Sequence, residues 1–112
     1  MRLGALTSDL MLYSRIEAMA AAGAASLAWS ADVAGLPPAI GLDLLLVDWS
    51  QRTDALAAEL AAWRAGASCR VIVFGPHTDL DAHAAARRAG LGPMWARSRL
   101  MRDLPPLLSR DA

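Results

Sequence analysis

Lysine is absent from this sequence of 112 residues, so basic charge comes from arginine alone. No mechanism that requires a lysine amine can therefore operate in this chain. Cysteine is almost as scarce, since Cys69 is the single one and cannot form an internal disulfide. An unpaired cysteine suits a reducing compartment without proving one, and we interpret Cys69 as a buried apolar residue ahead of a strand.

The sequence also lacks an excess of either charge and any long apolar run. Its 11 acidic side chains balance its 11 basic ones, so the electrostatic footprint of a nucleic-acid-binding protein is missing. The longest uncharged run, residues 18–31, is shorter than the roughly 20 residues that cross a bilayer. Asp9 interrupts the N-terminal apolar stretch before a signal-peptide core could form. We therefore expect a cytoplasmic protein with no nucleic-acid or membrane partner.

Signatures of catalysis and of cofactor binding are missing as well. The glycines form neither a phosphate-binding loop nor a dinucleotide fingerprint, and the chain has no Ser-His-Asp or Cys-His signature. His77, Asp79 and His83 lie close in sequence but follow no recognised metal-ligand spacing, and acids in a first helical turn are ordinary partners of the helix dipole. We predict no enzyme activity, no metal and no cofactor.

The most informative feature that is present is a short apolar run ending on a carboxylate, in Leu-Leu-Leu-Val-Asp. A run of this length is typical of a strand buried on both faces of a parallel sheet. Ligands of such sheets bind at the carboxyl ends of the strands. The acid that ends this run, Asp48, is therefore the first candidate functional residue.

Strand-like and helix-like segments alternate along the chain, which is typical of a parallel sheet with helices on both faces. We expect one domain over residues 1–112, with strands at 2–6, 25–30, 44–47, 70–74 and 94–96. Helices are expected from about residue 10 to Gly23 behind a cap at Thr7, Ser8 or Asp9, over 32–35, from Thr53 or Asp54 to Gly66, from Thr78 or Asp79 to Gly90, and over 101–108. Pro105 and Pro106 weaken the last of these, which would then begin near Leu104.

This order of elements, with an acid at the end of the third strand, resembles a response-regulator receiver domain over nearly the whole chain. The resemblance implies a doubly wound, flavodoxin-like (βα)5 fold with strand order 2-1-3-4-5. It also implies that Asp48 is equivalent to the aspartate that accepts a phosphoryl group in receivers.

The other motif positions depart from the receiver pattern. Receivers carry an acidic pair that holds Mg²⁺ after the first strand, and here the matching residues are Thr7 and Ser8, with Asp9 one place late. Receivers have Thr or Ser after the fourth strand, where this chain has Gly75. They have Lys after the fifth strand, where this chain has Arg97.

The arginine at the last of these positions introduces a different partner for Asp48. The planar guanidinium of Arg97 differs from the point charge of a lysine. It could pair directly with Asp48, and two charges about 4 Å apart attract by roughly 4 kcal/mol before desolvation is subtracted. We therefore expect Asp48 to be held by a salt bridge to Arg97 or by local capping contacts.

Three functions remain open at this point. The first is a degenerate receiver that is not phosphorylated and acts as a non-catalytic signalling or scaffolding module through protein–protein interaction. The second is an atypical single-domain response regulator that is phosphorylated on Asp48 with the help of Mg²⁺. The third is a flavodoxin-like domain that binds a small molecule in a crevice near Asp48, Gly75 and His77.

Three further residues lie at the same edge of the predicted sheet and are candidate contact residues, namely Trp49, His77 and Trp95. An exposed tryptophan at such an edge would mark a contact surface. The alternatives are packing of both tryptophans in the core and a purely local role for His77 in its loop.

Charged side chains also concentrate around the predicted fourth helix, fifth strand and last helix. In receivers this face commonly pairs two copies, so the resemblance implies a homodimer in which Arg99 or Arg102 meets acids such as Asp103 across a two-fold axis. The alternative is a solvated surface. The residues of this face are Arg87, Arg88, Arg99, Arg102 and Asp103.

Overall fold

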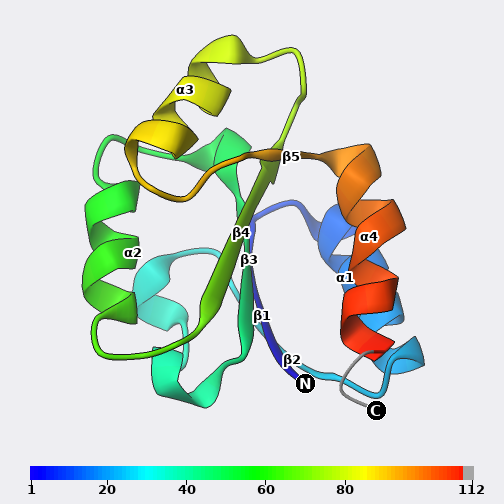
Figure 1. The fold of residues 1–112 in the computed structure, drawn as a ribbon. Helices are drawn as coiled ribbons and strands as arrows, with labels where there is room; N and C mark the ends of the chain where they lie inside the picture. Colours follow the sequence, from blue (N-terminus) through cyan, green and yellow to red (C-terminus); the bar gives the residue numbers. More distant parts are fainter. Residues whose placement is uncertain (110–112) are drawn as a thin grey trace.

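Five strands alternate with four α-helices in the computed structural model, which describes residues 1–109 (Figure 1). The strands are β1 (Arg2–Leu6), β2 (Ser26–Ser30), β3 (Leu44–Asp48), β4 (Arg70–Gly75) and β5 (Trp95–Ala96). The α-helices are α1 (Leu10–Ala22), α2 (Leu56–Arg64), α3 (Leu80–Arg88) and α4 (Arg97–Ser109). No strand end differs from its predicted position by more than one residue.

All strands are parallel and form one sheet in the order β2-β1-β3-β4-β5, which confirms the predicted topology. The helices α1 and α4 cover one face of the sheet, and α2 and α3 cover the other (Figure 1). The carboxyl ends of the strands therefore meet at one edge, at the top of the view, where a doubly wound domain binds its ligands.

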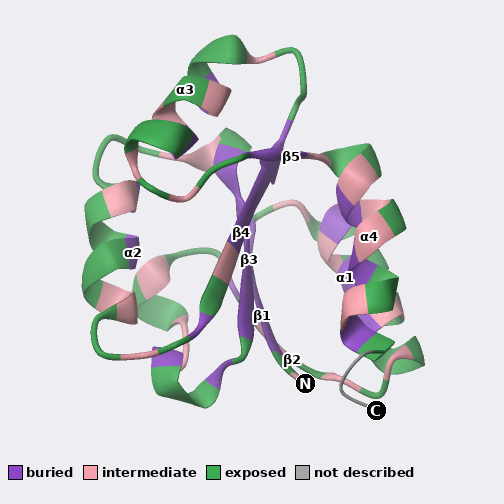
Figure 2. Cartoon of the chain, in the orientation of Figure 1, coloured by how far each residue is buried: buried purple, intermediate pink, exposed green. Residues whose placement is uncertain are grey.

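The central strand β3 is buried along its whole length (Figure 2). Its side chains alternate between two hydrophobic clusters. Leu44 and Leu46 pack with α1 and α4, whereas Leu45 and Val47 pack with α2 and α3. This double burial is why the segment reads as a continuous apolar run in the sequence.

The segment between β2 and β3 contains no α-helix, which corrects the expected (βα)5 fold. Two short 3₁₀ turns, Val33–Gly35 and Ala39–Gly41, take the place of a helix, and the short helix predicted over 32–35 is the first of them. Pro37 and Pro38 separate the two turns and prevent a continuous helix. Leu42 then packs closely over β1, since a Cβ atom at Gly4 would lie 2.7 Å from a methyl group of Leu42.

Two of the predicted helix caps are confirmed and one is wrong. Asp9 caps α1 by accepting hydrogen bonds from the backbone N–H groups of Met11 and Leu12, and Asp79 caps α3 in the same manner through Ala82. Neither Thr53 nor Asp54 caps α2, because a separate turn precedes that helix and its N-cap position falls on Ala55, which forms no side-chain cap.

Helix α4 begins earlier than predicted, directly after β5 at Arg97, and continues through Pro105 and Pro106. A proline inside a helix removes one backbone hydrogen bond and costs about 3 kcal/mol. Leu100, Leu104 and Leu108 offset this cost, since all three are buried on one stripe against α1 and the sheet. Burial of one such side chain stabilises by roughly 1.5–3 kcal/mol. Tertiary packing, rather than local propensity, therefore determines where α4 begins.

Among residues 1–109 no helix combines the length and the apolar character that a membrane span requires.

The packing of α4 leads to a stability prediction. Leu104→Ala should lower the free energy of unfolding by about 2–5 kcal/mol, because Leu104 is 0% exposed and its removal leaves a cavity under the proline pair. Leu80→Ala is the matched control, since Leu80 is 77% exposed and its truncation should change stability by less than about 0.5 kcal/mol. Urea denaturation followed by circular dichroism measures both values. Equal losses for the two variants would contradict the role given to the buried stripe.

Candidate functional site

Asp48 is the last residue of β3 and is only 3% exposed, so its carboxylate needs hydrogen-bond donors from the protein. Thr7 Oγ1 donates to Asp48 Oδ2 at 2.9 Å. The backbone N–H of Ser50 donates to Asp48 Oδ1 at 3.2 Å, and the Ser50 hydroxyl donates to the same oxygen. Both carboxylate oxygens are therefore engaged by local capping contacts.

Thr7 connects this carboxylate to the start of α1. It is fully buried at the end of β1, and its hydroxyl also accepts a hydrogen bond from the backbone N–H of Asp9 at 3.1 Å. A hydroxyl group has a single proton to donate, and Thr7 gives it to Asp48. The position at which receivers place a metal-binding acid is thus occupied by a buried donor.

Arg97 pairs with Asp9 and not with Asp48, which corrects the expected salt bridge. The Arg97 Nη1 to Asp9 Oδ2 distance is 3.4 Å, and the two side chains are 43% and 37% exposed. Asp48 is buried, so contact with it would require the guanidinium of Arg97 to lose its hydration, and desolvation of a charged group is costly. The backbone N–H of Leu12, aided by Arg97, holds the pKa of Asp9 below its usual value.

Gly75 ends β4 beside Asp48, and the space that a side chain would use there is filled from a different element. A Cβ atom at Gly75 would lie 3.1 Å from Met94 Sδ, and Met94 is itself buried. The thioether of Met94 therefore lies where the hydroxyl of a Thr or Ser at position 75 would be, and a thioether is a weak acceptor that donates no hydrogen bond. The space beside Gly75 is therefore filled by an apolar side chain.

Both tryptophans near the edge lie in the core, which confirms the alternative of core packing and excludes their role as exposed contact residues. Trp49 is 2% exposed and its Nε1 donates to the carbonyl oxygen of Ala82 at 3.0 Å. Trp95 is 6% exposed, and the guanidinium of Arg99 lies 4.1 Å from the centre of its ring. Each ring is large enough to pack in the core while one side reaches a polar group.

The exposed tryptophan at this end of the sheet is Trp29, which sequence reasoning missed. It lies on the edge strand β2, is 43% exposed, and packs against Tyr13 with ring centroids 5.5 Å apart. Its Nε1 donates to the carbonyl oxygen of Thr7 at 2.8 Å. The predicted strand order already placed β2 at an edge, and that was the signal available for finding Trp29.

His77 is exposed in the loop after β4, where its carbonyl oxygen accepts a hydrogen bond from His83 Nε2 at 3.0 Å. Asp79, the third member of the set considered for a metal, uses Oδ1 to cap α3. Within residues 1–109, no three His, Cys, Asp or Glu side chains are grouped so that they could hold a metal ion.

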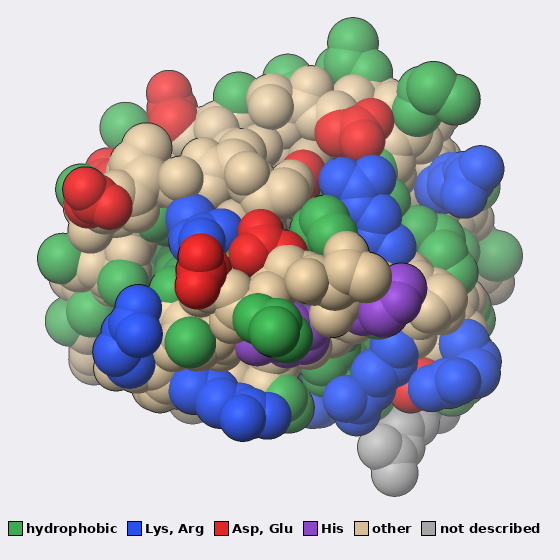
Figure 3. Space-filling model, turned by 90° about the horizontal axis from the view of Figure 1, so that it is seen from above, with side chains coloured by type: hydrophobic (Ala, Val, Ile, Leu, Met, Phe, Trp, Pro, Cys, Tyr) green, Lys and Arg blue, Asp and Glu red, His purple; other side chains and the backbone are tan. Residues whose placement is uncertain are grey.

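On the face formed by α3, β5 and α4, two arginines form ion pairs, and both pair with Asp103 of the same chain. Arg99 Nε lies 3.3 Å and Arg102 Nε 2.9 Å from Asp103 carboxylate oxygens. Arg102, followed by Arg99, lowers the pKa of Asp103. Arg87 and Arg88 are exposed at the end of α3. Viewed from the carboxyl edge of the strands, acidic and basic side chains are interspersed (Figure 3).

The role of Thr7 can be tested by removing its hydroxyl group at nearly constant shape. Thr7→Val should lower the free energy of unfolding by about 1–3 kcal/mol, because Asp48 Oδ2 and the Asp9 N–H would both lose a buried partner. Ser8→Ala, at an exposed neighbour, should cost less than about 0.5 kcal/mol. Guanidinium denaturation compares the two, and a Thr7→Val variant as stable as Ser8→Ala would show that the hydroxyl does not support Asp48.

No protein-family model matches the chain, and the search of curated proteins finds no match. Among solved structures, the chain is similar to a response regulator receiver domain protein from Clostridium thermocellum, with a TM-score of 0.72. The two share 12% sequence identity over 96% of this chain and 90% of the other. At that identity the likeness concerns the fold. The chain therefore has the fold of a response-regulator receiver domain, with four α-helices in the part that the structure describes.

Proposed function

We propose that this protein is a non-catalytic, receiver-like signalling or scaffolding module that acts through protein–protein interaction and is not phosphorylated. The observation that supports this proposal most strongly is the state of Asp48. Its two oxygens accept hydrogen bonds from Thr7 and Ser50 while the residue is 3% exposed. A phosphoacceptor needs one oxygen free to attack and room for the incoming group.

The acidic pair that would hold a metal beside Asp48 is also replaced, since Thr7 and Ser8 occupy those positions. Transfer depends on positioning and on neutralising the developing negative charge. Mg²⁺ binds through one or two carboxylates and keeps several waters. Asp9 uses Oδ1 to cap α1 and pairs with Arg97 through Oδ2, so a metal bound to Asp9 would have to displace Arg97 from that oxygen. The residues present therefore do not fit a magnesium site, and this weighs against the alternative of an atypical phosphorylated regulator.

The other alternative, a small molecule held beside Asp48, Gly75 and His77, has no supporting observation. Met94 fills the space next to Gly75, and the side chain of His77 lies exposed in its loop.

Treatment with acetyl phosphate or phosphoramidate in the presence of Mg²⁺ tests the proposal. Intact-mass spectrometry should show no gain of a phosphoryl group on the wild-type chain, because both Asp48 oxygens are engaged and buried. A phosphorylatable receiver domain treated in parallel confirms that the donor is active.

Phosphorylation of Asp48 would be recognised equally clearly in the same experiment. A Mg²⁺-dependent mass gain that disappears in Asp48→Asn but persists in Asp54→Asn would overturn the proposal and establish the phosphorylated alternative. Asp54 is a suitable control because it is an exposed acid in the turn before α2.

We further propose that one partner is a second copy of the chain, docked through α3, β5 and α4. Within residues 1–109, β5 pairs with β4 only at Phe74 and Gly75, so the outer side of β4 from Arg70 to Val73 has no neighbouring strand there. A hollow of about 490 Å³ lies beside it and is lined by residues that include Trp95, Arg99 and Leu107. The ion pairs of Asp103 are exposed and contribute little within one chain, so they are free to exchange for pairs between copies.

Charge reversal on this face should prevent the pairing of two copies. Sedimentation equilibrium over micromolar concentrations should show a wild-type dimer that Arg102→Glu dissociates, because Arg102 is exposed and its replacement would face Asp103 with like charge. Arg64→Glu on α2 should leave the dimer intact. A wild-type chain that is monomeric throughout this range, or equal dissociation by both variants, would exclude this dimer face.

A further inference from the structure

The strand β2 forms one edge of the sheet and pairs only with β1 in the part of the chain that the structure describes. It lies within residues 18–31, the longest uncharged run of the sequence. Edge strands of soluble proteins are commonly protected by charged side chains, proline or a bulge, because their unpaired backbone groups would otherwise bind another strand. The residues of β2 include no charge and no proline, and their pairing with β1 runs without a bulge. This edge is therefore open to a further strand.

The unpaired backbone groups of β2 belong to Leu27 and Trp29. In a parallel strand the N–H and C=O groups of one residue point to the same side, and successive residues alternate between the two sides. The Ser26 N–H donates to the carbonyl oxygen of the residue before β1, and the Ser30 carbonyl oxygen accepts from the N–H of the residue after β1. Leu27 and Trp29 therefore direct their N–H and C=O groups away from β1, toward the open edge.

The sequence around β2 is nearly self-complementary for antiparallel pairing of two copies. Residues 25–31 read Ala-Ser-Leu-Ala-Trp-Ser-Ala, which is the same in both directions except that Leu27 and Trp29 exchange. Two copies that run antiparallel about a two-fold axis at Ala28 therefore place Leu27 opposite Trp29. Both residues have free backbone groups, and residues directly opposite in such a pair exchange both hydrogen bonds. Ala28 meets its own copy at the narrower position between them, where a small side chain fits.

The side chains on the α1 face of the strand suit this contact. Trp29 is 43% exposed and packs against Tyr13. Its Nε1 donates to the carbonyl oxygen of Thr7 at 2.8 Å, so the indole is already held in place before a second copy binds. Leu27 is half-buried against the hydrophobic cluster beneath α1. A second copy would bring its Leu27 against Trp29, and contact between apolar side chains directly across a strand pair stabilises a sheet.

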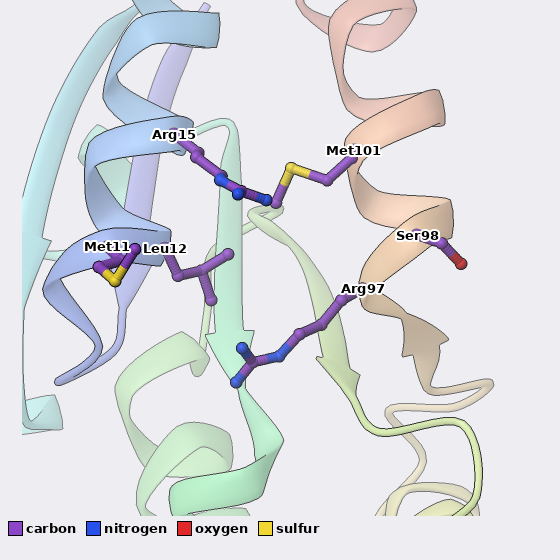
Figure 4. A pocket seen from close by; sticks show the side chains of 6 residues that line it. All are labelled: Met11, Leu12, Arg15, Arg97, Ser98 and Met101. Carbon is purple, nitrogen blue, oxygen red and sulfur yellow. The ribbon is translucent and has the colours of Figure 1, made fainter.

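The charges that flank β2 do not oppose the approach of a second copy. Arg15, the basic residue of α1, extends toward Met101 on α4 (Figure 4). Because α4 packs against β4 and β5, this guanidinium points away from β2. The acid of α1, Glu17, is exposed, so water screens its charge. Asp32 caps the turn that follows β2 and would lie opposite Ala24 of the second copy, which carries no charge.

We propose that β2 pairs with β2 of a second copy in antiparallel orientation about a two-fold axis at Ala28, so that two sheets join into one. A single strand pair is smaller than the interface of a stable dimer, and we expect a dissociation constant of roughly 0.1–1 mM. This association is weaker than the pairing proposed for α3, β5 and α4, and the two faces lie at opposite edges of the sheet. The inference therefore depends neither on that face nor on the state of Asp48.

Amide hydrogen exchange of the ¹⁵N-labelled full chain, measured by NMR, tests this pairing. The chain carries Arg102→Glu, so that the face formed by α3, β5 and α4 does not contribute. Exchange of the Leu27 and Trp29 N–H groups should slow about two- to fivefold between about 20 µM and about 1 mM, by mass action at the expected affinity. The N–H of His77, exposed in the loop after β4, should keep its exchange rate.

Two further variants in the same background locate the axis. Ala28→Lys should abolish the slowing, because it would set two like charges directly opposite each other across the strand pair. Ala61→Lys makes the same change at an exposed site on α2 and should leave the slowing intact. The dispersion of the NMR spectrum shows that each variant is folded.

Three results would overturn the proposal. The first is exchange of the Leu27 and Trp29 N–H groups that does not depend on concentration up to about 1 mM. The second is equal loss of the slowing in Ala28→Lys and Ala61→Lys, which would indicate general charge repulsion. The third is a concentration-dependent shift of the Trp29 indole signal without protection of the backbone, which would show contact through side chains alone.

Discussion

The buried carboxylate of Asp48 imposes the constraint on which the carboxyl edge of the sheet depends. A charged group with 3% exposure must be matched by donors, and the structure supplies them from Thr7 at the end of β1 and Ser50 after β3. These contacts tie together the ends of two neighbouring strands. Because the Thr7 hydroxyl also accepts from the Asp9 backbone, the same network positions the first turn of α1. Removal of one member would leave the others buried without partners.

The network also explains why Arg97 lies where it does. Asp9 caps α1 with one carboxylate oxygen and faces Arg97 with the other, so the buried hydrogen bonds of Asp48 continue outward to an exposed ion pair between α1 and α4. The neutral hydroxyl of Thr7 occupies the inside, and the guanidinium remains at the surface where water reduces the cost of its charge.

Most of the fold was predictable from the sequence, because the strands are encoded locally. The runs 44–47 and 71–74 are apolar, and such runs are typical of strands buried on both faces. Helix ends were less predictable where packing overrides propensity, as in α4, whose buried leucines extend it through two prolines. A helix before β3 was implied by the resemblance alone, because Pro37 and Pro38 interrupt that segment and leave two short 3₁₀ turns.

The candidate site was predictable in its residue types but not in its pairings. Thr7, Gly75 and Arg97 were identified as departures from the receiver pattern, yet the depth of Asp48 decides which partner each finds. At that depth a neutral hydroxyl fits and a guanidinium does not, so Arg97 remains outside with Asp9.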